Sequence, residues 1–240
     1  MAGWLTSRQL RRMRRDWDER ARENARHFVV TGQPEWTDEE FFRSGEVAMA
    51  EDILNDLENI CQGLDPKQMR VLEIGCGAGR MTRALANFFG EVYAVDISAE
   101  MVHQASRAVA AFPNARVFRN NGRDLSVIRP AWRDWGARFC YPAPAFDFAF
   151  SSMVFQHVPS HRIVENYVRE VHHLLRPGAL FKFQVQGSPA VRTQPEDTWV
   201  GAPFTEEQAR QMARRCGFEL RYQMGIGEQY YWLWYFKLMQ

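Results

Sequence analysis

Residues 71–80, VLEIGCGAGR, constrain the fold more than any other stretch of this chain. A short apolar run leads directly into three glycines at alternate positions, Gly75, Gly77 and Gly79. Glycine lowers the stability of strands and helices, so three of them within five residues indicate a turn with special backbone angles or a close contact. A helix is expected after this turn, and the free N–H groups at its start favour a carboxylate or a phosphate.

The chain alternates between short apolar runs and helical segments from residue 69 onward, which is typical of parallel βαβ units. We expect strands at 69–75, 91–96, 115–119, 146–151 and 179–186. We expect helices at 79–89, 98–111, 160–175 and 205–216. Ser98 is the expected N-cap of the second, and Thr205 with Gln208 is expected to form a capping box for the last. The last two aromatic-rich runs, 218–225 and 229–238, predict an antiparallel hairpin. The expected fold is α/β, a doubly wound and mostly parallel seven-stranded sheet with a C-terminal antiparallel hairpin and an N-terminal helical cap.

The first 66 residues have a different, helical pattern. Apolar residues recur at three- and four-residue steps over 8–28, which predicts one amphipathic helix. Thr37 and Glu40 form a capping box that starts a second helix. Gly45 is expected to interrupt that helix, and 47–61 to continue it. We therefore expect a cap or lid at 1–66 and a core at 67–240. The residues expected in the lid are Trp17, Arg20, Asn24, Phe41, Phe42, Ser44 and Gly45. For Trp17, as for Phe28, simple packing of the helix on the sheet is the favoured alternative.

The composition excludes several classes of protein. The net charge is +1, so no bulk field favours nucleic acid or a membrane surface. The four cysteines are far apart, and no carboxylates or histidines cluster at ligand spacing, so neither disulfides nor a metal site are expected. No apolar run reaches the roughly 20 residues of a membrane span. A reduced, cytoplasmic protein is the expectation.

Asp96 ends the expected strand 91–96, at a position suited to a ribose. An acid about 20 residues after a glycine-rich turn can accept hydrogen bonds from ribose hydroxyls. The alternative is that Asp96 only caps the helix that follows. Arg80 stands where a dinucleotide fingerprint would have its third glycine, which disfavours a pyrophosphate and suits a ligand with one carboxylate.

Five segments in order now resemble the class I S-adenosylmethionine (SAM)-dependent methyltransferases. They are Glu73 to Gly79, Asp96, Asn121 to Leu125, Phe146 to Ser151 with the following residues, and Leu174 to Leu180. The resemblance covers about residues 69–186. It departs from the common pattern in the long link 126–145, where residue roles are not carried over.

The resemblance implies SAM as the cofactor and a set of residues that hold it. The acid and glycines of the first segment would surround the methionine end, Asp96 the ribose, and Asp124 the adenine amino group, with a simple turn role as the alternative for Asp124. The implied cofactor residues are Glu73, Gly75, Gly77, Gly79, Asp96, Ile97, Met101, Gly122, Arg123, Asp124, Ser151, Ser152 and Met153.

The methyl acceptor is expected beyond the carboxyl ends of the strands, near the residues that follow 146–151. Gln184 and Gln186 are unusually polar for a buried central strand. His157 is the first candidate for a base, because histidine titrates near neutrality. The alternative is that His157 packs or caps the next helix, and His27 is an outside candidate.

Four functions remain open. A methyltransferase acting on O, N or C of a small molecule is the first, and nucleic acid is not expected as its partner. An RNA or protein methyltransferase is the second; arginines are numerous in 8–26, but acids are interleaved with them. An NAD-dependent oxidoreductase is disfavoured by Arg80, and a non-catalytic SAM-binding protein is the fourth.

Overall fold

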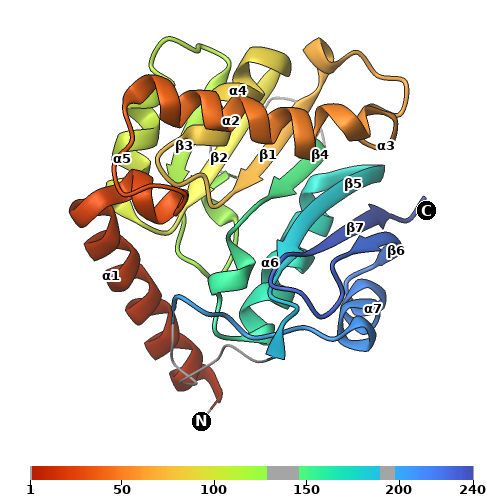
Figure 1. The fold of residues 1–240 in the computed structure, drawn as a ribbon. Coiled ribbons are helices and arrows are strands. Elements are labelled where there is room, and N and C mark those ends of the chain that lie inside the picture. The colour runs from red at the N-terminus through yellow and green to blue at the C-terminus, as the bar shows by residue number, and fades with distance from the viewer. Residues whose placement is uncertain (1, 129–145, 190–197, 240) are drawn as a thin grey trace, which may run out of the picture. The chain divides into compact units, whose positions relative to one another are not determined.

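A computed structural model describes residues 2–128, 146–189 and 198–239 (Figure 1). The chain forms two compact units. Arg14–Asn120 make the first, called here the glycine-loop unit, and Met1–Met13 with Asn121–Gln240 make the second, called the C-terminal unit. These units differ in their bounds from the predicted cap at 1–66 and core at 67–240. That a cap of residues 1–66 covers the core stays a prediction.

The glycine-loop unit combines helices from the N-terminal segment with a parallel three-stranded sheet. Its strands lie in the order β3-β2-β1, with Ile74 of β1 opposite Val95 of β2 and Val95 opposite Phe118 of β3. The helical elements are α1 (Ala2–Val29, which begins in the other unit), α2 (Asp38–Asp52), η1 (Leu54–Asp56), α3 (Leu57–Cys61), η2 (Pro66–Gln68), α4 (Arg80–Phe88) and α5 (Ala99–Ala108). The strands are β1 (Arg70–Ile74), β2 (Glu91–Asp96) and β3 (Ala115–Arg119).

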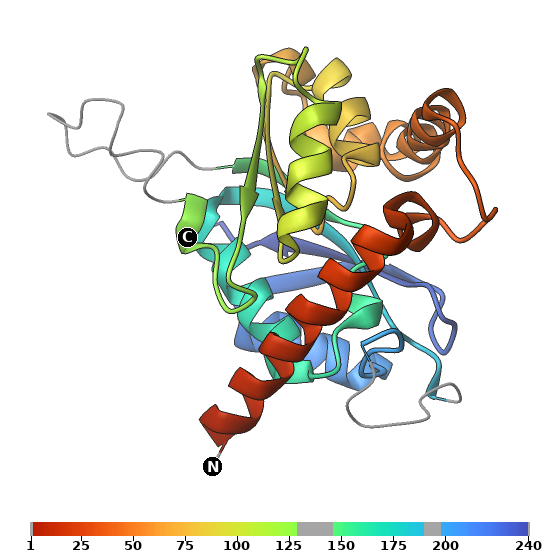
Figure 2. The same ribbon diagram turned by 90° about the vertical axis from the view of Figure 1, so that its left-hand side faces the viewer.

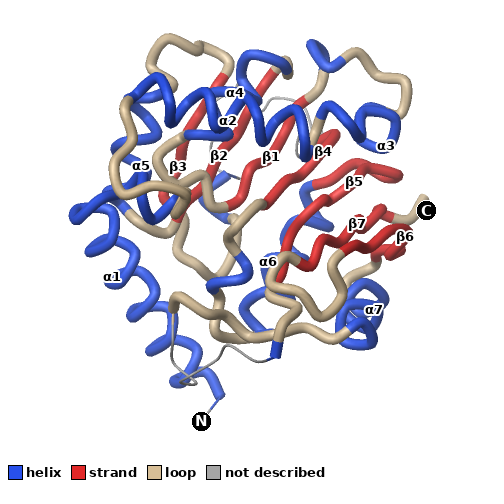
Figure 3. The backbone as a smooth tube through the Cα atoms, in the orientation of Figure 1, coloured by secondary structure: helices blue, strands red, loops and turns tan. Residues whose placement is uncertain are grey.

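The C-terminal unit contains a mixed sheet in the order β4-β5-β7-β6 (Figure 3). β4 (Phe146–Ser151) and β5 (Leu175–Val185) are parallel, whereas β7 (Tyr231–Lys237) runs antiparallel to both β5 and β6 (Phe218–Met224). The remaining elements are η3 (Ser126–Ile128), η5 (Phe155–His157), α6 (His161–Leu174) and α7 (Glu206–Arg215). The strand order β3-β2-β1-β4-β5-β7-β6 confirms the predicted class of a mostly parallel seven-stranded sheet with a C-terminal antiparallel hairpin.

The local start signals in the sequence are confirmed by hydrogen bonds. Thr37 and Glu40 form the capping box of α2, and Thr205 with Gln208 forms that of α7. Ser98 is the N-cap of α5 and accepts a hydrogen bond from the backbone N–H of Met101. Each side chain satisfies a backbone donor that the helix itself leaves unpaired, which is why these residue types mark helix starts.

Gly45 was expected to interrupt a helix, and this prediction is wrong. α2 runs through Gly45 without a break, and Gly45 is buried. A Cβ built there would lie 2.4 Å from the carbonyl oxygen of Arg80. The glycine is therefore explained by the close approach of α2 to the start of α4 rather than by a break in the helix.

The helix predicted over 47–61 is divided. α2 ends at Asp52, the 3-10 turn η1 follows, and α3 covers only Leu57–Cys61. Asn55 and Asp56 lie at this break, and their short polar side chains favour turns over helix interiors. α1 also contains a break, because Asn24 has non-helical angles and its Oδ1 accepts from the N–H of His27, which starts a new helical turn.

Candidate functional site

The glycine-rich loop lies between β1 and α4 in the glycine-loop unit. The backbone N–H groups of Gly75 and Cys76 both donate to the carbonyl oxygen of Val95, at 2.7 and 3.0 Å, which ties the loop to β2. Gly75, Gly77 and Gly79 all have positive φ, at 76°, 53° and 88°. These angles favour glycine over residues with a side chain, so the alternating glycines follow from the backbone path.

Two of these glycines also meet other parts of the chain at close range. A Cβ at Gly77 would lie 2.6 Å from Cγ2 of Val29, at the end of α1, and a Cβ at Gly79 would lie 3.0 Å from Cα of Ala105 on α5. No pattern in the sequence indicated the Val29 contact. The N-terminal segment therefore covers part of the loop, and the loop approaches α5 closely.

Asp96 is held at the carboxyl end of β2 by two backbone donors. Its Oδ2 accepts from the N–H of Gly77 and its Oδ1 from the N–H of Ser98, both at 2.9 Å. Burial raises the pKa of Asp96 to about 6, although these backbone hydrogen bonds act to lower it. The two donors fix the plane of the carboxylate, and each oxygen keeps a second lone pair for a further donor.

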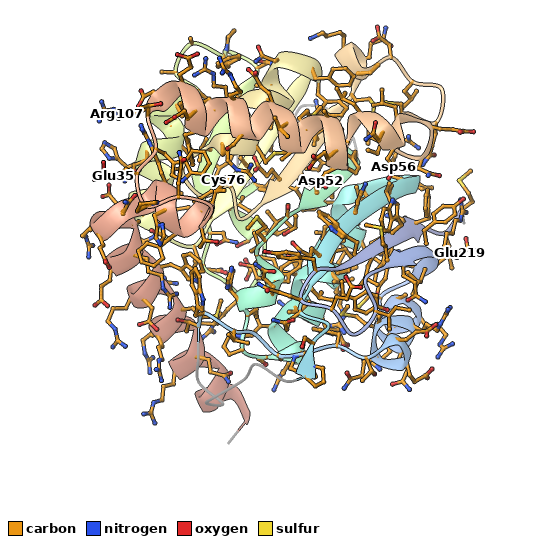
Figure 4. All side chains as sticks on the ribbon, viewed as in Figure 1. Glu35, Asp52, Asp56, Cys76, Arg107 and Glu219 are labelled. Carbon is orange, nitrogen blue, oxygen red and sulfur yellow. The ribbon has the colours of Figure 1, made fainter. Side chains whose placement is uncertain are left out.

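Glu73 is a second buried acid, on β1. Its Oε2 accepts from the hydroxyl of Thr82 at 2.6 Å, and burial raises its pKa to about 7 while the Arg80 guanidinium acts to lower it. Cys76 lies in the adjoining loop (Figure 4), and burial raises the pKa of its thiol well above the usual range. This part of the unit therefore disfavours additional negative charge.

Arg80 does not face an open loop but is buried against α2. Its Nη1 donates to the carbonyl oxygen of Ser44 at 2.9 Å, and only 8% of the residue is exposed. Burial lowers the pKa of this guanidinium, while Asp52 of α2 (Figure 4) and Glu73 act to raise it. Arg80 thus joins the end of the glycine-rich loop to the N-terminal segment.

The remaining predicted cofactor residues of this unit lie beside the loop. Met101 is buried on α5 and belongs to one apolar cluster with Ala78, Ala21, Ala25 and Phe41. Trp17 and Phe42, both expected in the lid, pack against the same cluster. Ile97 is half-buried between Asp96 and Ser98. The structure therefore brings the seven predicted residues from Glu73 to Met101 into one region, together with α1 and α2.

The predicted adenine segment belongs to the C-terminal unit and forms a tight turn. Oδ1 of Asp124 accepts from the amide of Asn121 and from the backbone N–H of Ser126, both at 3.0 Å. Gly122 has φ of 76° and is buried. This is the turn role left open for Asp124, and its contact with adenine stays a prediction. Arg123 donates to the hydroxyl of Ser7 at 2.5 Å.

A cavity of about 610 Å³ adjoins this turn. Its lining includes Gly122 and Arg123, Leu10 of α1 and the first turns of α6. The volume lies within the range of small-molecule pockets, about 300–1,000 Å³. No residue roles were assigned to the link 126–145 from the sequence, and its residues 129–145 lie outside the described part of the chain.

The residues after β4 are connected by a chain of hydrogen bonds. Met153 has a positive φ of 59°, unusual for a residue with a side chain, and its N–H donates to Oε1 of Gln184 at 2.8 Å. Nε2 of Gln184 donates to Oε1 of Gln156 at 3.3 Å, and Nε2 of Gln156 lies 3.2 Å from Nε2 of His157. Nδ1 of His157 contacts the carbonyl oxygen of Trp199.

The two ends of this chain determine its polarity. A backbone N–H can only donate, and a backbone carbonyl can only accept. Nδ1 of His157 must therefore carry a proton to reach the Trp199 carbonyl, and its Nε2 accepts from Gln156. Each of the two side-chain amides then has one allowed orientation. His157 is 7% exposed, and its ring lies against that of Trp199 with centroids 5.0 Å apart.

Sequence reasoning found part of this arrangement. Gln184 was singled out as an unusually polar residue in a buried strand, and the hydrogen bond to Met153 explains it. Ser151 is fully buried at the end of β4. Ser152 is half-buried between it and Met153. Trp199 was not anticipated, because it meets His157 through a contact distant in sequence. The same holds for Asp18 of α1, which accepts a hydrogen bond from the hydroxyl of Ser98.

The described residues contain no group of three or more His, Cys, Asp or Glu side chains placed to hold a metal ion. None of the described helices is both long and apolar enough to cross a membrane.

A family model described as a methyltransferase domain matches residues 46–223, which is more than half of the chain. The chain belongs to this methyltransferase family. The match confirms the family predicted from the glycine-rich loop and the four other segments. No curated protein matches this methyltransferase.

Several solved proteins, two methyltransferases and a cyclase among them, share the fold of this chain at low sequence identity. Magnesium protoporphyrin IX methyltransferase from Synechocystis PCC 6803, with bound SAM, is 16% identical over 95% of this chain and 97% of its own, with a TM-score of 0.63. Phosphoethanolamine N-methyltransferase 1 from Haemonchus contortus is 14% identical over 96% of this chain and 49% of its own, with a TM-score of 0.64. A cyclase named SpnF is 15% identical over 87% of this chain and 84% of its own, with a TM-score of 0.57.

These findings confirm the predicted enzyme class, a SAM-dependent methyltransferase with SAM as its cofactor, at the level of family and fold.

Proposed function

We propose that this methyltransferase transfers the methyl group of SAM to an oxygen, nitrogen or carbon atom of a small-molecule acceptor. The observation that carries the proposal is the Asp96 carboxylate, oriented by the N–H groups of Gly77 and Ser98 at the end of β2. Its remaining lone pairs can accept hydrogen bonds from the two hydroxyls of a ribose. The capping role of Asp96, considered as an alternative from the sequence, is compatible with this second role.

The charges around the loop fit SAM better than a dinucleotide. Glu73 and Asp96 are both acids in buried surroundings near the glycine-rich loop, and Asp18 adds to the negative charge that Asp96 experiences. Such surroundings oppose a pyrophosphate and favour a ligand that carries an ammonium and a sulfonium group. The NAD-dependent oxidoreductase considered from the sequence is therefore disfavoured by charge as well as by the family match.

The proposed cofactor residues are those implied by the resemblance. In the glycine-loop unit they are Glu73, Gly75, Gly77, Gly79, Asp96, Ile97 and Met101. In the C-terminal unit they are Gly122, Arg123, Asp124, Ser151, Ser152 and Met153. When bound, SAM supplies an activated methyl group whose leaving group is neutral. The protein's contribution is then to align the acceptor and exclude water.

A small-molecule acceptor is supported by the relatives rather than by a specific contact. Two solved proteins of the same fold are named for magnesium protoporphyrin IX and for phosphoethanolamine. The net charge of +1 provides no bulk attraction to nucleic acid. RNA or a protein remains the alternative acceptor, and a methyl-transfer assay distinguishes small molecules, RNA and proteins.

His157 was the predicted base, and its contacts bear on that role. An oxygen or nitrogen acceptor that carries a proton must lose it on methylation, and a base assists. Nε2 of His157 accepts from Gln156 and Nδ1 contacts the Trp199 carbonyl, so His157 would act as a base only if the Gln156 amide moved away. The geometry favours a role in holding the segment after β4, and the base role stays a prediction.

The cofactor half of the proposal is tested by isothermal titration calorimetry. SAM and S-adenosylhomocysteine should bind saturably, and NAD should give no heat. Asp96→Ala should weaken SAM binding by about 100-fold or more, since two hydrogen bonds to a charged acceptor, at about 1.5–3 kcal/mol each, are lost. Glu219→Ala, which removes an acid from β6 (Figure 4), is the matched control and should bind SAM like the wild type. Binding of NAD but not SAM would refute the proposal.

The acceptor half requires a panel assay. Transfer of a labelled methyl group from SAM would be followed into metabolites, RNA and proteins in parallel. Label in a small molecule is the expected result, and label only in RNA or protein would overturn the acceptor class. A different reaction is a second candidate, because the cyclase SpnF shares this fold. Saturable SAM binding without transfer to any class would favour that candidate.

A further inference from the structure

α1 passes beside the N-terminal end of α5 in the glycine-loop unit (Figure 2). Asp18 of α1 contacts this end of α5. Its Oδ1 accepts from the hydroxyl of Ser98 at 2.6 Å and lies 3.4 Å from the backbone nitrogen of Glu100. The two residues are separated by 80 positions in the sequence. A carboxylate at this place also satisfies the helix start electrostatically, because the first turn of a helix carries partial positive charge.

Ser98 is the connection between Asp18 and the predicted ribose acid. Its backbone N–H donates to Asp96 at 2.9 Å, and its hydroxyl accepts from the N–H of Met101 at 3.2 Å. Ser98 is fully buried. Its hydroxyl has a single proton, and that proton is given to Asp18.

Removing Asp18 would leave this proton without its acceptor. A buried hydroxyl that loses its acceptor either donates to another acceptor or stays unsatisfied, which destabilises the protein by the free energy of desolvation. The Asp96 carboxylate is the neighbouring acceptor, because its Oδ1 already lies at hydrogen-bond distance from the backbone of Ser98. A bond from the Ser98 hydroxyl to Asp96 would compete with a ribose hydroxyl for the same oxygen.

From these contacts we infer that Asp18 is a positioning residue of the cofactor site: by accepting the proton of Ser98, it keeps the Asp96 carboxylate available to the ribose of SAM. This inference rests on the proposed function. It also assigns a role to α1 that differs from that of a separate lid, because this part of α1 completes the surroundings of the ribose acid.

Other contacts keep the same part of α1 in place. The side chain of Gln104, on α5, donates to the carbonyl oxygen of Ala21 at 3.4 Å. Val29 lies against Gly77, whose N–H is the second donor to Asp96. Ser98 and Gly77, whose backbone N–H groups donate to Asp96, are therefore both in contact with α1, the first through Asp18 and the second through Val29.

The test compares three single variants by calorimetry with SAM. Asp18→Ala should weaken SAM binding about tenfold, the effect of losing roughly one hydrogen bond to the charged Asp96. Asp18→Asn keeps an oxygen that can accept from Ser98 and should bind within about threefold of the wild type. Glu19→Ala removes the adjacent acid, whose side chain is 63% exposed, and should not change the affinity.

A double-mutant cycle separates this mechanism from general destabilisation. If competition by the Ser98 hydroxyl is the cause, Asp18→Ala should cost little affinity in a Ser98→Ala background. An equal loss in both backgrounds would overturn the inference. Thermal unfolding of each variant shows whether it is folded at the assay temperature, and Asp18→Asn still tests the inference if Asp18→Ala is not.

The pH dependence of SAM binding supplies a readout that a purely structural role would not move. The titratable groups that face Asp96 are Asp18 on α1 together with Glu73 and Cys76 around β1, and Arg119 of β3 faces Asp18. Asp18 acts to raise the pKa of Asp96. Binding should weaken as pH falls through that pKa, and Asp18→Asn should move the midpoint to lower pH.

The outcomes distinguish the two proposals. If the wild type does not bind SAM, the proposed function is refuted. If the wild type binds and folded Asp18→Ala binds equally well, only the role of Asp18 is refuted. An unchanged pH midpoint in Asp18→Asn would likewise overturn the coupling between Asp18 and Asp96.

Discussion

Gly45→Ala provides a direct test of how α2 meets the start of α4, because helix propensity and packing predict changes in stability of opposite sign. Alanine is favoured over glycine in a helix interior by about 1 kcal/mol, so propensity alone predicts a more stable protein. The structure predicts the reverse. A Cβ at this position would lie 2.4 Å from the Arg80 carbonyl oxygen, and ordinary contact begins at 3.4 Å. α2 would have to move by about 1 Å relative to α4.

The cost can be estimated from what that movement disturbs. Overpacking costs about 1–3 kcal/mol, and the hydrogen bond from Arg80 to the Ser44 carbonyl, one involving a charged group, contributes about 1.5–3 kcal/mol. After the gain in propensity, we expect a net loss of about 2 kcal/mol or more in the free energy of unfolding. For a chain of this length that corresponds to a fall in Tm of about 4–8 °C.

Urea unfolding, followed by circular dichroism, measures this difference. Two variants serve as controls. Gly32→Ala makes the same change where the nearest atom would be 3.7 Å away, and Val47→Ala changes an α2 side chain that is 52% exposed. Neither should lower stability by more than about 0.5 kcal/mol. A Gly45→Ala protein as stable as the wild type, or more stable, would refute the described contact between α2 and α4.

Three other predictions concern buried groups near the loop and after β4. Burial raises the pKa of Glu73 from 4.5 to about 7, because the folded protein favours the neutral carboxyl group. The stability that this preference provides is fully present below pH 4.5 and is lost as the pH rises through 7. Glu73→Gln should therefore gain about 3 kcal/mol relative to the wild type between pH 4.5 and pH 8 in urea unfolding, and parallel pH curves would contradict this. Gly77→Ala should lose about 1–2 kcal/mol from its positive φ plus a steric cost. Adding Val29→Ala to the Gly77→Ala variant should recover only the stability lost to the steric contact. Recovery of the full loss would show that the positive φ of residue 77 does not affect stability. His157→Ala should lower turnover more than SAM affinity; His157→Asn restores activity if the residue holds the Trp199 segment, whereas a base role predicts no rescue.

The order of the elements and the nature of the loop were determined by the sequence itself. Alternating apolar runs and helical segments placed β2, β3 and β4 with the bounds later observed, because strand and helix periodicity are local properties. The capping boxes and Ser98 were recognised for the same reason, since each satisfies donors within three residues. The positive φ angles explain the alternating glycines of residues 75–79 through local backbone geometry.

Contacts between distant residues were decided only by the tertiary structure. Gly45 was interpreted as a helix break because the approach of Arg80 is invisible in the sequence around it. The contacts of Asp18 with Ser98 and of Val29 with Gly77 join positions far apart in the chain. The proton on Nδ1 of His157 follows from a backbone carbonyl 42 residues away. The local sequence pattern shows how a segment satisfies its own backbone hydrogen-bonding groups. The hydrogen-bond partner of a buried side chain depends instead on how segments distant in the sequence pack together.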